Sequence, residues 1–222
     1  MKLSNIKVYD LEESICASGF PMSIEPDSAR KELTPQDFKR IFGLTRASHE
    51  DNRAHGQWLT GIRVAFDLTF TNKAWVEAER YRFLEFVSSQ STMHRITSFD
   101  IKSQCNKYVD PRIIEILEEK VTYYKVLKEE LKHASEDASK EALANQLAEA
   151  YLDILYNIPS GFELTARMTT NYRCLLNIFE QRWDHRLPEW REFCRKLLTL
   201  PYFKELLEVY RPDIIEKLSQ KI

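Results

Sequence analysis

One stretch of the sequence, residues 169–182, places the end of a strand directly before an amphipathic helix. Apolar residues alternate with polar ones from Phe162 to Met168, as in a half-buried strand. Asn171 then supplies a side-chain oxygen of the kind that caps a helix. After it, apolar side chains recur at the helical spacing i, i+3, i+4, i+7 and i+11: Tyr172, Leu175, Leu176, Phe179 and Trp183. The stretch therefore predicts a strand that runs straight into a helix with one buried face.

This predicted helix also carries polar residues suited to a ligand. Asn171 and Arg182 are eleven residues apart, which returns them to nearly the same helical angle, about 16 Å apart along the axis. We expect both to flank the apolar face, so that an amide and a guanidinium face one groove, whereas Asn177 points the other way. As alternatives, Asn171 is a plain helix cap and Arg182 is a cation favoured by the helix dipole.

Length and charge set the class of protein. A chain of 222 residues can bury a sizeable core, and we expect one domain over residues 1–222. The net charge of −2 shows no basic excess of the kind that binds nucleic acid. No apolar run approaches the roughly 20 residues that a membrane span needs, and the first residues lack the apolar core of a secretory signal. We therefore expect a protein that binds neither nucleic acid nor membrane.

The cysteines and histidines give no sign of a metal site. Cys16, Cys105, Cys174 and Cys194 are widely separated and form no CxxC pair, which indicates a reduced, cytoplasmic protein. His49 and His55 lie six residues apart with no further ligand pattern around them, so we expect no bound metal.

The order of predicted elements indicates an α+β fold, a small antiparallel sheet layered with long helices. The predicted strands cover residues 6–11, 62–70 and 162–168. The predicted helices cover 35–43, 73–86 with Asn72 as cap, 111–133 and 139–156, and two more begin at Pro188 and Pro201. The helices between about 111 and 156 form a hairpin, and we expect 17–31, 45–58 and 96–110 to be mostly irregular.

Two segments resemble the flavin-dependent thymidylate synthases, the ThyX family. The first has that family's order of a strand, N-x-R-x-L-x-N, a helix ending in Arg, and a Trp eight residues later: Asn171, Arg173, Leu175, Asn177, Arg182 and Trp190. The second places Arg80-Tyr81-Arg82 where the family has R-H-R, followed by the polar loop Ser88-Ser89-Gln90-Ser91. The resemblance covers about residues 55–95 and 155–195.

The resemblance implies a homotetramer that binds FAD between subunits and methylates a pyrimidine nucleotide, as in the conversion of dUMP to dTMP. Methylenetetrahydrofolate would supply the carbon and NADPH would reduce the flavin. FAD would contact Arg80, Tyr81, Arg82, Asn171 and Asn177. The nucleotide would contact Arg80, Ser88, Ser89, Ser91, Arg95 and Arg182, with Arg182 as the catalytic residue facing the uracil ring. Guanidinium groups suit both tasks, because they match phosphate geometry and stabilise charge that develops on a ring.

The chain departs from the family pattern on the nucleotide side. Tyr81 replaces the histidine of R-H-R, and Met93 stands where the family has an arginine. Leu155 falls at the family's phosphate-binding arginine, and Gly61 at a histidine before the strand. A buried phosphate without its arginine would lose charge-assisted hydrogen bonds of about 1.5–3 kcal/mol each.

Three functional hypotheses follow from these observations. The first is a ThyX-like enzyme. The second is a member of the same fold that binds FAD or another nucleotide with altered or lost catalysis. The third is a helical interaction domain built on the amphipathic hairpin. For Arg80 and Arg82, the alternative to ligand binding is a solvated helix face paired with Glu77 and Glu79. The three serines could likewise form an ordinary polar turn.

Overall fold

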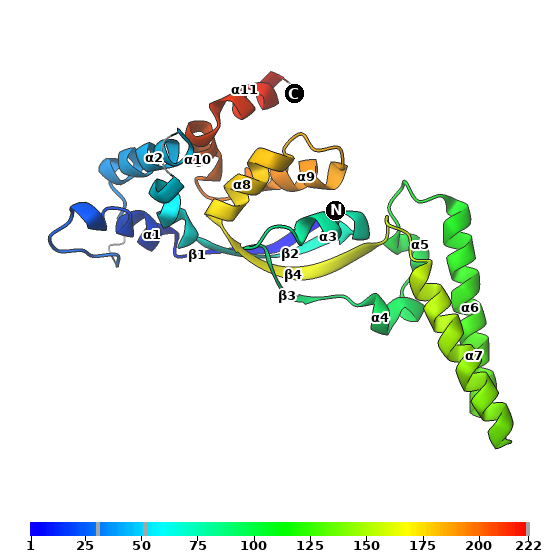
Figure 1. The fold of residues 1–222 in the computed structure, drawn as a ribbon. Helices are drawn as coiled ribbons and strands as arrows, with labels where there is room; N and C mark the ends of the chain where they lie inside the picture. The colour runs from blue at the N-terminus through cyan, green and yellow to red at the C-terminus, as the bar shows by residue number, and fades with distance from the viewer. Residues whose placement is uncertain (30–31, 51–52, 221–222) are drawn as a thin grey trace. The chain divides into compact units, whose positions relative to one another are not determined.

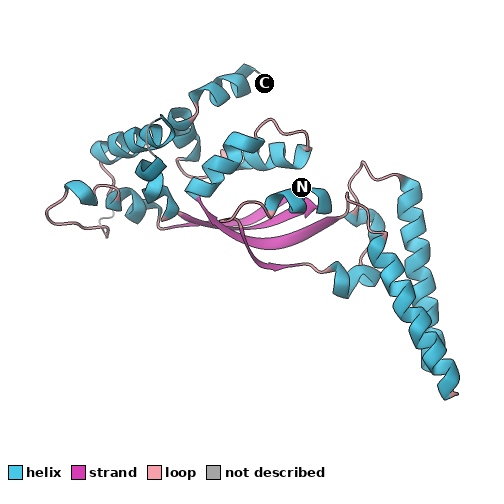
Figure 2. Ribbon diagram, in the orientation of Figure 1, coloured by secondary structure: helices cyan, strands magenta, loops and turns pink. Residues whose placement is uncertain are grey.

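The computed structural model, which describes residues 1–29, 32–50 and 53–220, contains a four-stranded antiparallel sheet. The strands are β1 (Lys2–Tyr9), β2 (Arg63–Thr71), β3 (Glu85–Ser89) and β4 (Glu163–Asn171), in the order β1-β2-β4-β3 (Figures 1 and 2). At one end of the β2–β4 pair, Tyr172 N–H donates to the carbonyl of Ile62 at 3.1 Å. At the other end, Asn72 N–H donates to the carbonyl of Phe162 at 2.9 Å. The chain therefore passes directly from β2 into one helix and from β4 into another. The small antiparallel α+β fold is confirmed.

Cross-strand side chains fix the register of β2 and β4. The hydroxyls of Thr69 and Thr165 lie 2.8 Å apart, and Arg167 Nη1 lies 3.1 Å from Asp67 Oδ1. Asp67 also accepts a hydrogen bond from Asn5, and this bond together with Arg167 lowers the pKa of its carboxyl. The opposite face of β2 is apolar and buried from Val64 to Phe70. A shift of the strand pairing by one residue would turn that apolar face to solvent. Burial of this face and the cross-strand side-chain contacts therefore specify the same register.

The chain separates into two compact units, each with its own core, so the single domain predicted over residues 1–222 stays a prediction. The first unit contains residues 1–68, 77–88 and 166–222. In it, α8 (Tyr172–Arg182) and α9 (Pro188–Leu197) lie over one face of the sheet (Figure 1). Its remaining helices are α1 (Leu11–Ala17), η1 (Phe20–Met22), α2 (Pro35–Glu50), η2 (Arg53–Thr60), α10 (Phe203–Tyr210) and α11 (Pro212–Gln220).

Aromatic side chains fill the core of the first unit. Phe193 of α9 packs between Phe66 of β2 and Trp190, with ring centroids 5.8 and 5.9 Å away. Tyr172 and Phe203 meet edge to face at 5.4 Å, which joins α8 to α10. All five side chains are buried. These contacts hold α8 in a fixed position on the sheet, so the residues on its outward side are rigidly presented.

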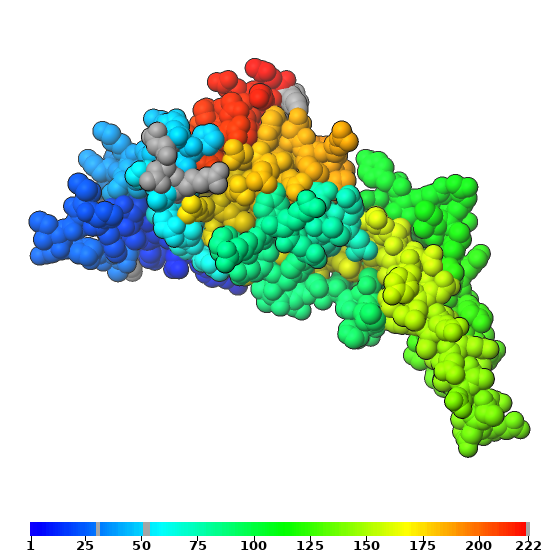
Figure 3. All heavy atoms as spheres, in the orientation of Figure 1, coloured from blue at the N-terminus to red at the C-terminus, as the bar shows by residue number. Residues whose placement is uncertain are grey.

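The second unit contains residues 69–76 and 89–165. Its long helices, α6 (Pro111–His133) and α7 (Asp137–Tyr156), lie side by side, as the space-filling view shows (Figure 3). Leu117, Val121 and Ile154 pack with Phe162 in a separate apolar core. The short helices α4 (Thr92–Arg95), η3 (Ile96–Ser98) and α5 (Ile101–Gln104) complete the unit. The predicted hairpin between 111 and 156 is confirmed.

The predicted helix over 73–86 is wrong in its second half. Helix α3 (Asn72–Ala78) ends at Ala78, and the chain turns through residues 79–84 before it enters β3. Tyr81 N–H donates to the carbonyl of Ala78, and Leu84 N–H donates to the carbonyl of Tyr81. Both Tyr81 and Leu84 are buried, so tertiary packing overrides the helical pattern here. Thr71, not Asn72, caps α3, because its hydroxyl accepts from Ala74 N–H at 3.2 Å.

Other predicted boundaries move by smaller amounts. Helix α2 continues past Gly43 to Glu50, because Ile41, Thr45 and Ser48 extend its buried face. Part of the predicted loop over 45–58 is therefore helical. Residues 51–52 of that loop lie outside the described residues, and so do residues 30–31 of the predicted loop over 17–31. The first strand covers Lys2–Tyr9 rather than 6–11, and α11 is an additional C-terminal helix.

Candidate functional site

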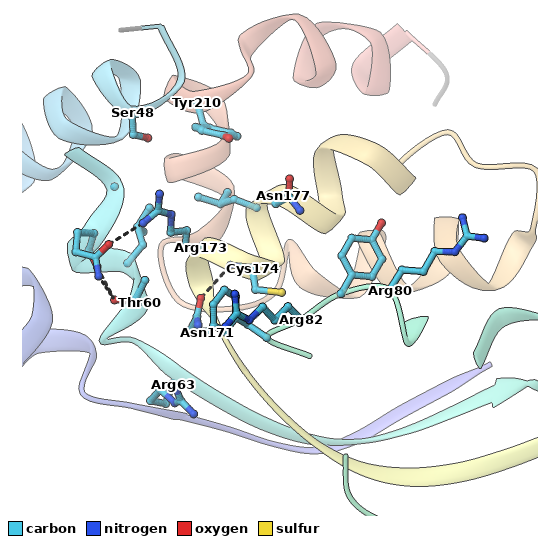
Figure 4. Close-up of a pocket in the computed structure, with 16 residues that line it drawn as sticks. Ser48, Thr60, Arg63, Arg80, Arg82, Asn171, Arg173, Cys174, Asn177 and Tyr210 are labelled. Atoms are coloured by element: carbon cyan, nitrogen blue, oxygen red, sulfur yellow. Dashed lines mark hydrogen bonds between the residues drawn. The ribbon is translucent and has the colours of Figure 1, made fainter. Parts of the chain in front are cut away.

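A cavity of about 700 Å³ lies in the first unit, beside the start of α8 (Figure 4). Its walls come from α2, η2, the start of β2, the turn after α3, α8 and the end of α10. The described residues that line it are Ser48, Gly56, Gln57, Leu59, Thr60, Arg63, Arg80, Tyr81, Arg82, Phe83, Asn171, Arg173, Cys174, Leu176, Asn177 and Tyr210. Five of the predicted site residues therefore meet at one cavity: Arg80, Tyr81, Arg82, Asn171 and Asn177.

Four guanidinium groups dominate the charge of the cavity, and no carboxylate is among the described residues that line it. Arg63, Arg80 and Arg82 form no ion pair with any residue in the described part of the chain. The guanidinium of Arg82 lies 5.6 Å from the ring centre of Phe83, and Arg173 donates to Gln57 Oε1 at 2.8 Å. Such a donor set suits a ligand with phosphate or other anionic oxygens.

Asn171 is both the helix cap and part of the cavity wall. Its backbone is extended (φ −139°, ψ 165°), and its Oδ1 accepts from Cys174 N–H at 2.9 Å. The capping oxygen is thereby occupied, which leaves the NH2 group of this buried amide for a ligand. Burial raises the pKa of the neighbouring Cys174 thiol, which disfavours the thiolate form.

Asn177 lines the same cavity as Asn171, so the expectation that it points the other way is wrong. Its Oδ1 accepts from Gln181 Nε2 at 3.0 Å, one helical turn further along α8. Helix α8 rests on the sheet through its apolar face, and the open space lies over its first two turns, where both asparagines fall.

Arg182 lies outside the residues that line the cavity, so it does not share a groove with Asn171 as the helical spacing predicts. Its side chain is 14% exposed, and its Nη1 lies 2.9 Å from Glu77 Oε2. The guanidinium stands 5.6 Å from the ring centre of Tyr81 and 5.0 Å from that of Trp190. Pairing with a largely buried carboxylate explains the position, because an unpaired buried charge is costly.

Tyr81 connects Arg182 to the cavity wall. Its hydroxyl accepts from Arg182 Nε at 2.7 Å and donates to Gln181 Oε1 at 3.0 Å. Burial raises the pKa of this hydroxyl, and the hydrogen bond from Arg182 opposes that rise. The tyrosine that replaces the family's histidine therefore has two specific partners on α8.

The remaining predicted nucleotide contacts do not line this cavity. Ser88 and Ser89 belong to β3 and are exposed, and Ser91 precedes α4 without capping it through its side chain. Arg95 ends α4 and is exposed. Ser88 is part of the first unit, whereas Ser89, Ser91 and Arg95 belong to the second.

Three of the departures from the family pattern have a structural setting. A Cβ on Gly61 would collide with Ser14 Oγ and lie 3.3 Å from Ser14 Cβ, so α1 takes the space that a histidine would need. Leu155 is half-buried and packs against the apolar core of the second unit. Met93 is exposed, and its carbonyl accepts from the hydroxyl of Tyr151 at 2.7 Å.

Several residues of this region have no signal in the sequence. Glu77 pairs with Arg182, not with Arg80 or Arg82 as the surface alternative predicts. Gln181 completes the contact between Tyr81 and α8. The cavity lining from Ser48, Gln57, Thr60, Arg63 and Tyr210 has no such signal either. These positions are far apart in the sequence, so no local spacing could identify them.

The described residues also bear on membrane spans and metal sites. Of the helices in the described part of the chain, none is long and apolar enough to cross a membrane. Within the same residues, no group of three or more His, Cys, Asp or Glu side chains is placed to hold a metal ion. His49 instead packs against the ring of Tyr210, with centroids 5.0 Å apart.

Comparisons with known proteins agree with this fold. No curated protein matches the chain significantly. A ThyX flavin-dependent thymidylate synthase from Helicobacter pylori, solved with FAD and dUMP, is 14% identical with a TM-score of 0.59, covering 96% of this chain and 99% of that chain. A UMP/dUMP methylase, PolB, from Streptomyces cacaoi, bound with 5-Br dUMP, is 16% identical with a TM-score of 0.53, covering 94% of this chain and 93% of that one. At such identities the likeness is one of fold.

The family model described as thymidylate synthase complementing protein matches residues 82–202, more than half of the chain. That segment includes β3, both long helices, β4, α8 and α9. It also includes Asn171, Asn177 and Arg182 of the first resembling segment, whereas Arg80 and Tyr81 of the second lie just before it. The chain therefore belongs to the thymidylate synthase complementing protein family, ThyX.

Proposed function

We propose that this protein is a flavin-dependent enzyme that methylates a pyrimidine nucleotide, in a reaction of the dUMP-to-dTMP type. A folate carries the one-carbon unit, and NADPH is the reductant. The observation that carries the proposal is the cavity beside α8, where four guanidinium groups meet two asparagine amides without a lining carboxylate among the described residues. Both relatives reported above were solved with pyrimidine nucleotides, and one of them with FAD.

The side chains of the cavity fit FAD by their chemistry. Arg63, Arg80 and Arg82 supply fixed positive charge for the two phosphates of such a ligand. Asn171 and Asn177 supply N–H donors for ring carbonyl oxygens. When bound, the flavin provides the hydride chemistry, and the protein provides position and electrostatics.

Arg182 acts in this proposal through Tyr81 rather than by touching the uracil ring. Its guanidinium is engaged by Glu77 and by the Tyr81 hydroxyl, which leaves it poorly placed to face a ligand in this cavity. Its charge still lies directly behind the ring of Tyr81, which forms part of the wall. Arg182 is therefore proposed as a positioning residue.

The substrate nucleotide is assigned to polar residues within or after β3, of which Ser88, Ser89 and Arg95 are exposed and Ser91 is half-buried. Ser88, Ser89, Ser91 and Arg95 lie within or shortly after that strand, and none has a described ion pair that would occupy it. Hydroxyl groups and a guanidinium are suitable partners for a nucleotide phosphate.

Self-association into a homotetramer is part of the proposal. β3 is the last strand in the sheet order, and all five of its residues are exposed. Phe86 and Val87 are 44% and 63% exposed on this edge strand. An exposed edge strand that carries two large apolar side chains favours association with a second copy of the chain.

A tritium-release assay tests the reaction. Purified protein is incubated with FAD, 5-tritiated dUMP, methylenetetrahydrofolate and NADPH, and the tritium in water is counted. The proposal predicts release that requires all four additions and that falls by about tenfold or more in an Arg80→Gln, Arg82→Gln double variant. The matched control is the double variant Arg195→Gln, Lys196→Gln, which also removes two positive charges, from exposed side chains that pair with Glu192. Release from the control at the wild-type rate, with none from a complete mixture lacking protein, supports the assignment.

A second candidate function is a ThyX-fold protein that binds FAD or another nucleotide with altered or lost catalysis. The observation in its favour is the engagement of Arg182 by Glu77, together with the space at Gly61 that Ser14 occupies. Flavin binding without tritium release would select this function over the first.

A further inference from the structure

A chain of hydrogen bonds runs from a largely buried ion pair to the cavity wall. Arg182 Nη1 donates to Glu77 Oε2 at 2.9 Å, and its Nε donates to the Tyr81 hydroxyl at 2.7 Å. That hydroxyl donates to Gln181 Oε1 at 3.0 Å, and Gln181 Nε2 donates to Asn177 Oδ1 at 3.0 Å. The cavity is lined by two members of this chain, Tyr81 and Asn177.

The donor and acceptor chemistry of Glu77 and Arg182 fixes which group donates at each hydrogen bond of this series. An ionised glutamate only accepts hydrogen bonds, and an arginine only donates them. Because the Tyr81 hydroxyl accepts from Arg182, its single proton is given to the oxygen of Gln181. The NH2 group of Gln181 is then the group that faces Asn177, whose oxygen accepts. The NH2 group of Asn177 remains for the cavity.

We propose that Glu77, Arg182, Tyr81 and Gln181 are positioning residues that hold the amide of Asn177 with its NH2 group toward the cavity. The inference rests on the proposed function, since it assigns the kind of ligand atom that Asn177 binds. A neutral amide has no intrinsic preference between its two orientations, and its partners decide which one is populated.

Burial makes Tyr81 the essential link of the chain. Gln181 is exposed, so its amide alone would exchange hydrogen bonds freely with water. Tyr81 is only 8% exposed, lies under the guanidinium of Arg182 and meets the ring of Trp190 edge to face, with ring centres 5.9 Å apart. A rigid donor hydroxyl at this position orients Gln181, and Gln181 in turn orients Asn177.

The side-chain amide of Asn171 is held in the same orientation by a different partner. Its oxygen accepts from the backbone N–H of Cys174, which can only donate. Two side-chain amides, each fixed by a donor-only group, thus present N–H groups to one cavity beside guanidinium groups. This wall selects a ligand edge rich in acceptors, such as the ring carbonyl oxygens of a flavin or a pyrimidine.

The test first compares variants that break the series of hydrogen bonds at side chains other than Asn177. Tyr81→Phe deletes only the hydroxyl, and Gln181→Met deletes both hydrogen bonds at similar size. Each is expected to weaken FAD binding by about three- to tenfold and to alter the absorption spectrum of the bound flavin. The double variant should bind FAD about as tightly as the single variant with the lower affinity, because both changes break the same series of hydrogen bonds. Asn177→Leu removes the amide itself and sets the upper limit of the effect.

The matched control is Tyr151→Phe. It deletes a hydroxyl that also donates a hydrogen bond, to the carbonyl of Met93 at 2.7 Å, within the second unit. FAD binding and the flavin spectrum of this control should equal those of the wild type. A purely structural role for Tyr81 would lower thermal stability and leave the bound spectrum unchanged.

Thermal unfolding of the ligand-free variants separates the possible failures. Suppose that the wild type binds FAD and that Tyr81→Phe and Gln181→Met either leave its FAD affinity unchanged or lower it additively. This result would overturn the inference and leave the proposed function standing. If the wild type binds neither FAD nor dUMP, the proposed function fails and the inference fails with it. Non-additive unfolding free energies would then show that the chain of hydrogen bonds serves stability alone.

Discussion

The side chain of Ser14 on α1 occupies the space beside Gly61 that any larger residue at position 61 would need. A Cβ at this position would collide with Ser14 Oγ, and Gly61 N–H is already bonded to the carbonyl of Trp58 at 3.1 Å. The packing of α1 therefore explains why the chain has glycine immediately before β2.

Restoring a histidine at this position should be destabilising. Gly61→His is expected to lower the free energy of unfolding by about 1–3 kcal/mol, because the imidazole would overpack the contact with Ser14. Thermal denaturation of Gly61→His, alone and combined with Ser14→Gly, measures this effect. The second change should recover part of the loss. A Gly61→His variant as stable as the wild type would show that α1 can shift to admit the imidazole without loss of unfolding free energy.

The two functions of Asn171 can be separated by substitution. Asn171→Asp keeps the oxygen that caps α8 and removes the NH2 group, whereas Asn171→Ala removes both. We expect Asn171→Ala to lower the free energy of unfolding by about 1 kcal/mol, and Asn171→Asp to leave it nearly unchanged. Both variants should bind FAD more weakly than the wild type. Chemical denaturation and FAD titration together distinguish a plain cap, which would leave FAD affinity intact in Asn171→Asp.

The pair of Glu77 and Arg182 should behave as one unit. Both side chains are largely buried, at 16% and 14% exposure, and the indole of Trp190 donates to the same Glu77 oxygen at 3.1 Å. Glu77→Ala is expected to destabilise by about 2–4 kcal/mol, because it leaves the guanidinium without its carboxylate. The Glu77→Ala, Arg182→Met double variant should be less destabilised than the sum of its single changes. Additive losses in urea denaturation would show that the two residues act independently.

A salt bridge at the start of α11 should make stability depend on acid pH. Arg211 donates to both carboxylate oxygens of Asp213, at 2.8 and 2.9 Å, and also bonds Glu180 of α8. The hydrogen bond with Arg211 lowers the pKa of Asp213 to about 2. Its contribution is complete above the unfolded pKa of about 3.9 and is lost as the pH falls through the folded pKa.

Asp213→Asn should therefore reduce the loss of thermal stability between about pH 4 and pH 2, while lowering stability at neutral pH. The matched control is Asp137→Asn, since the Asp137 side chain is fully exposed and lies 3.6 Å from Lys140. Melting temperatures measured from pH 2 to pH 7 check this expectation. Identical pH profiles for Asp213→Asn and the wild type would contradict it.

The elements with strong local patterns could be predicted from the sequence. Alternation from Ile62 to Phe70 and the cap at Asn171 each specify one local structure, and the structure has both. The helix expected over 73–86 fails because Tyr81 and Leu84 gain more from burial against other elements than from helical hydrogen bonds. Helix propensity is a weak preference that such contacts override.

The site was only partly predictable for a related reason. Motif spacing identified Arg80, Arg82 and Asn171, which line one cavity. It could not reveal that Glu77 would pair with Arg182, because this contact joins residues 105 apart in the sequence. Asn177 lines the cavity because residues from α2, η2 and the turn after α3 surround that part of α8, and helical angle alone does not show this.

The visible absorption spectrum of the purified protein tests the central claim most directly. The protein is incubated with FAD and passed through a desalting column to remove free flavin, and the spectrum of the protein fraction is recorded. The account predicts a retained flavin band at about 450 nm, and a smaller band in the Arg80→Gln, Arg82→Gln variant treated in parallel. A folded wild-type protein that emerges colourless, before and after incubation with FAD, would contradict the account.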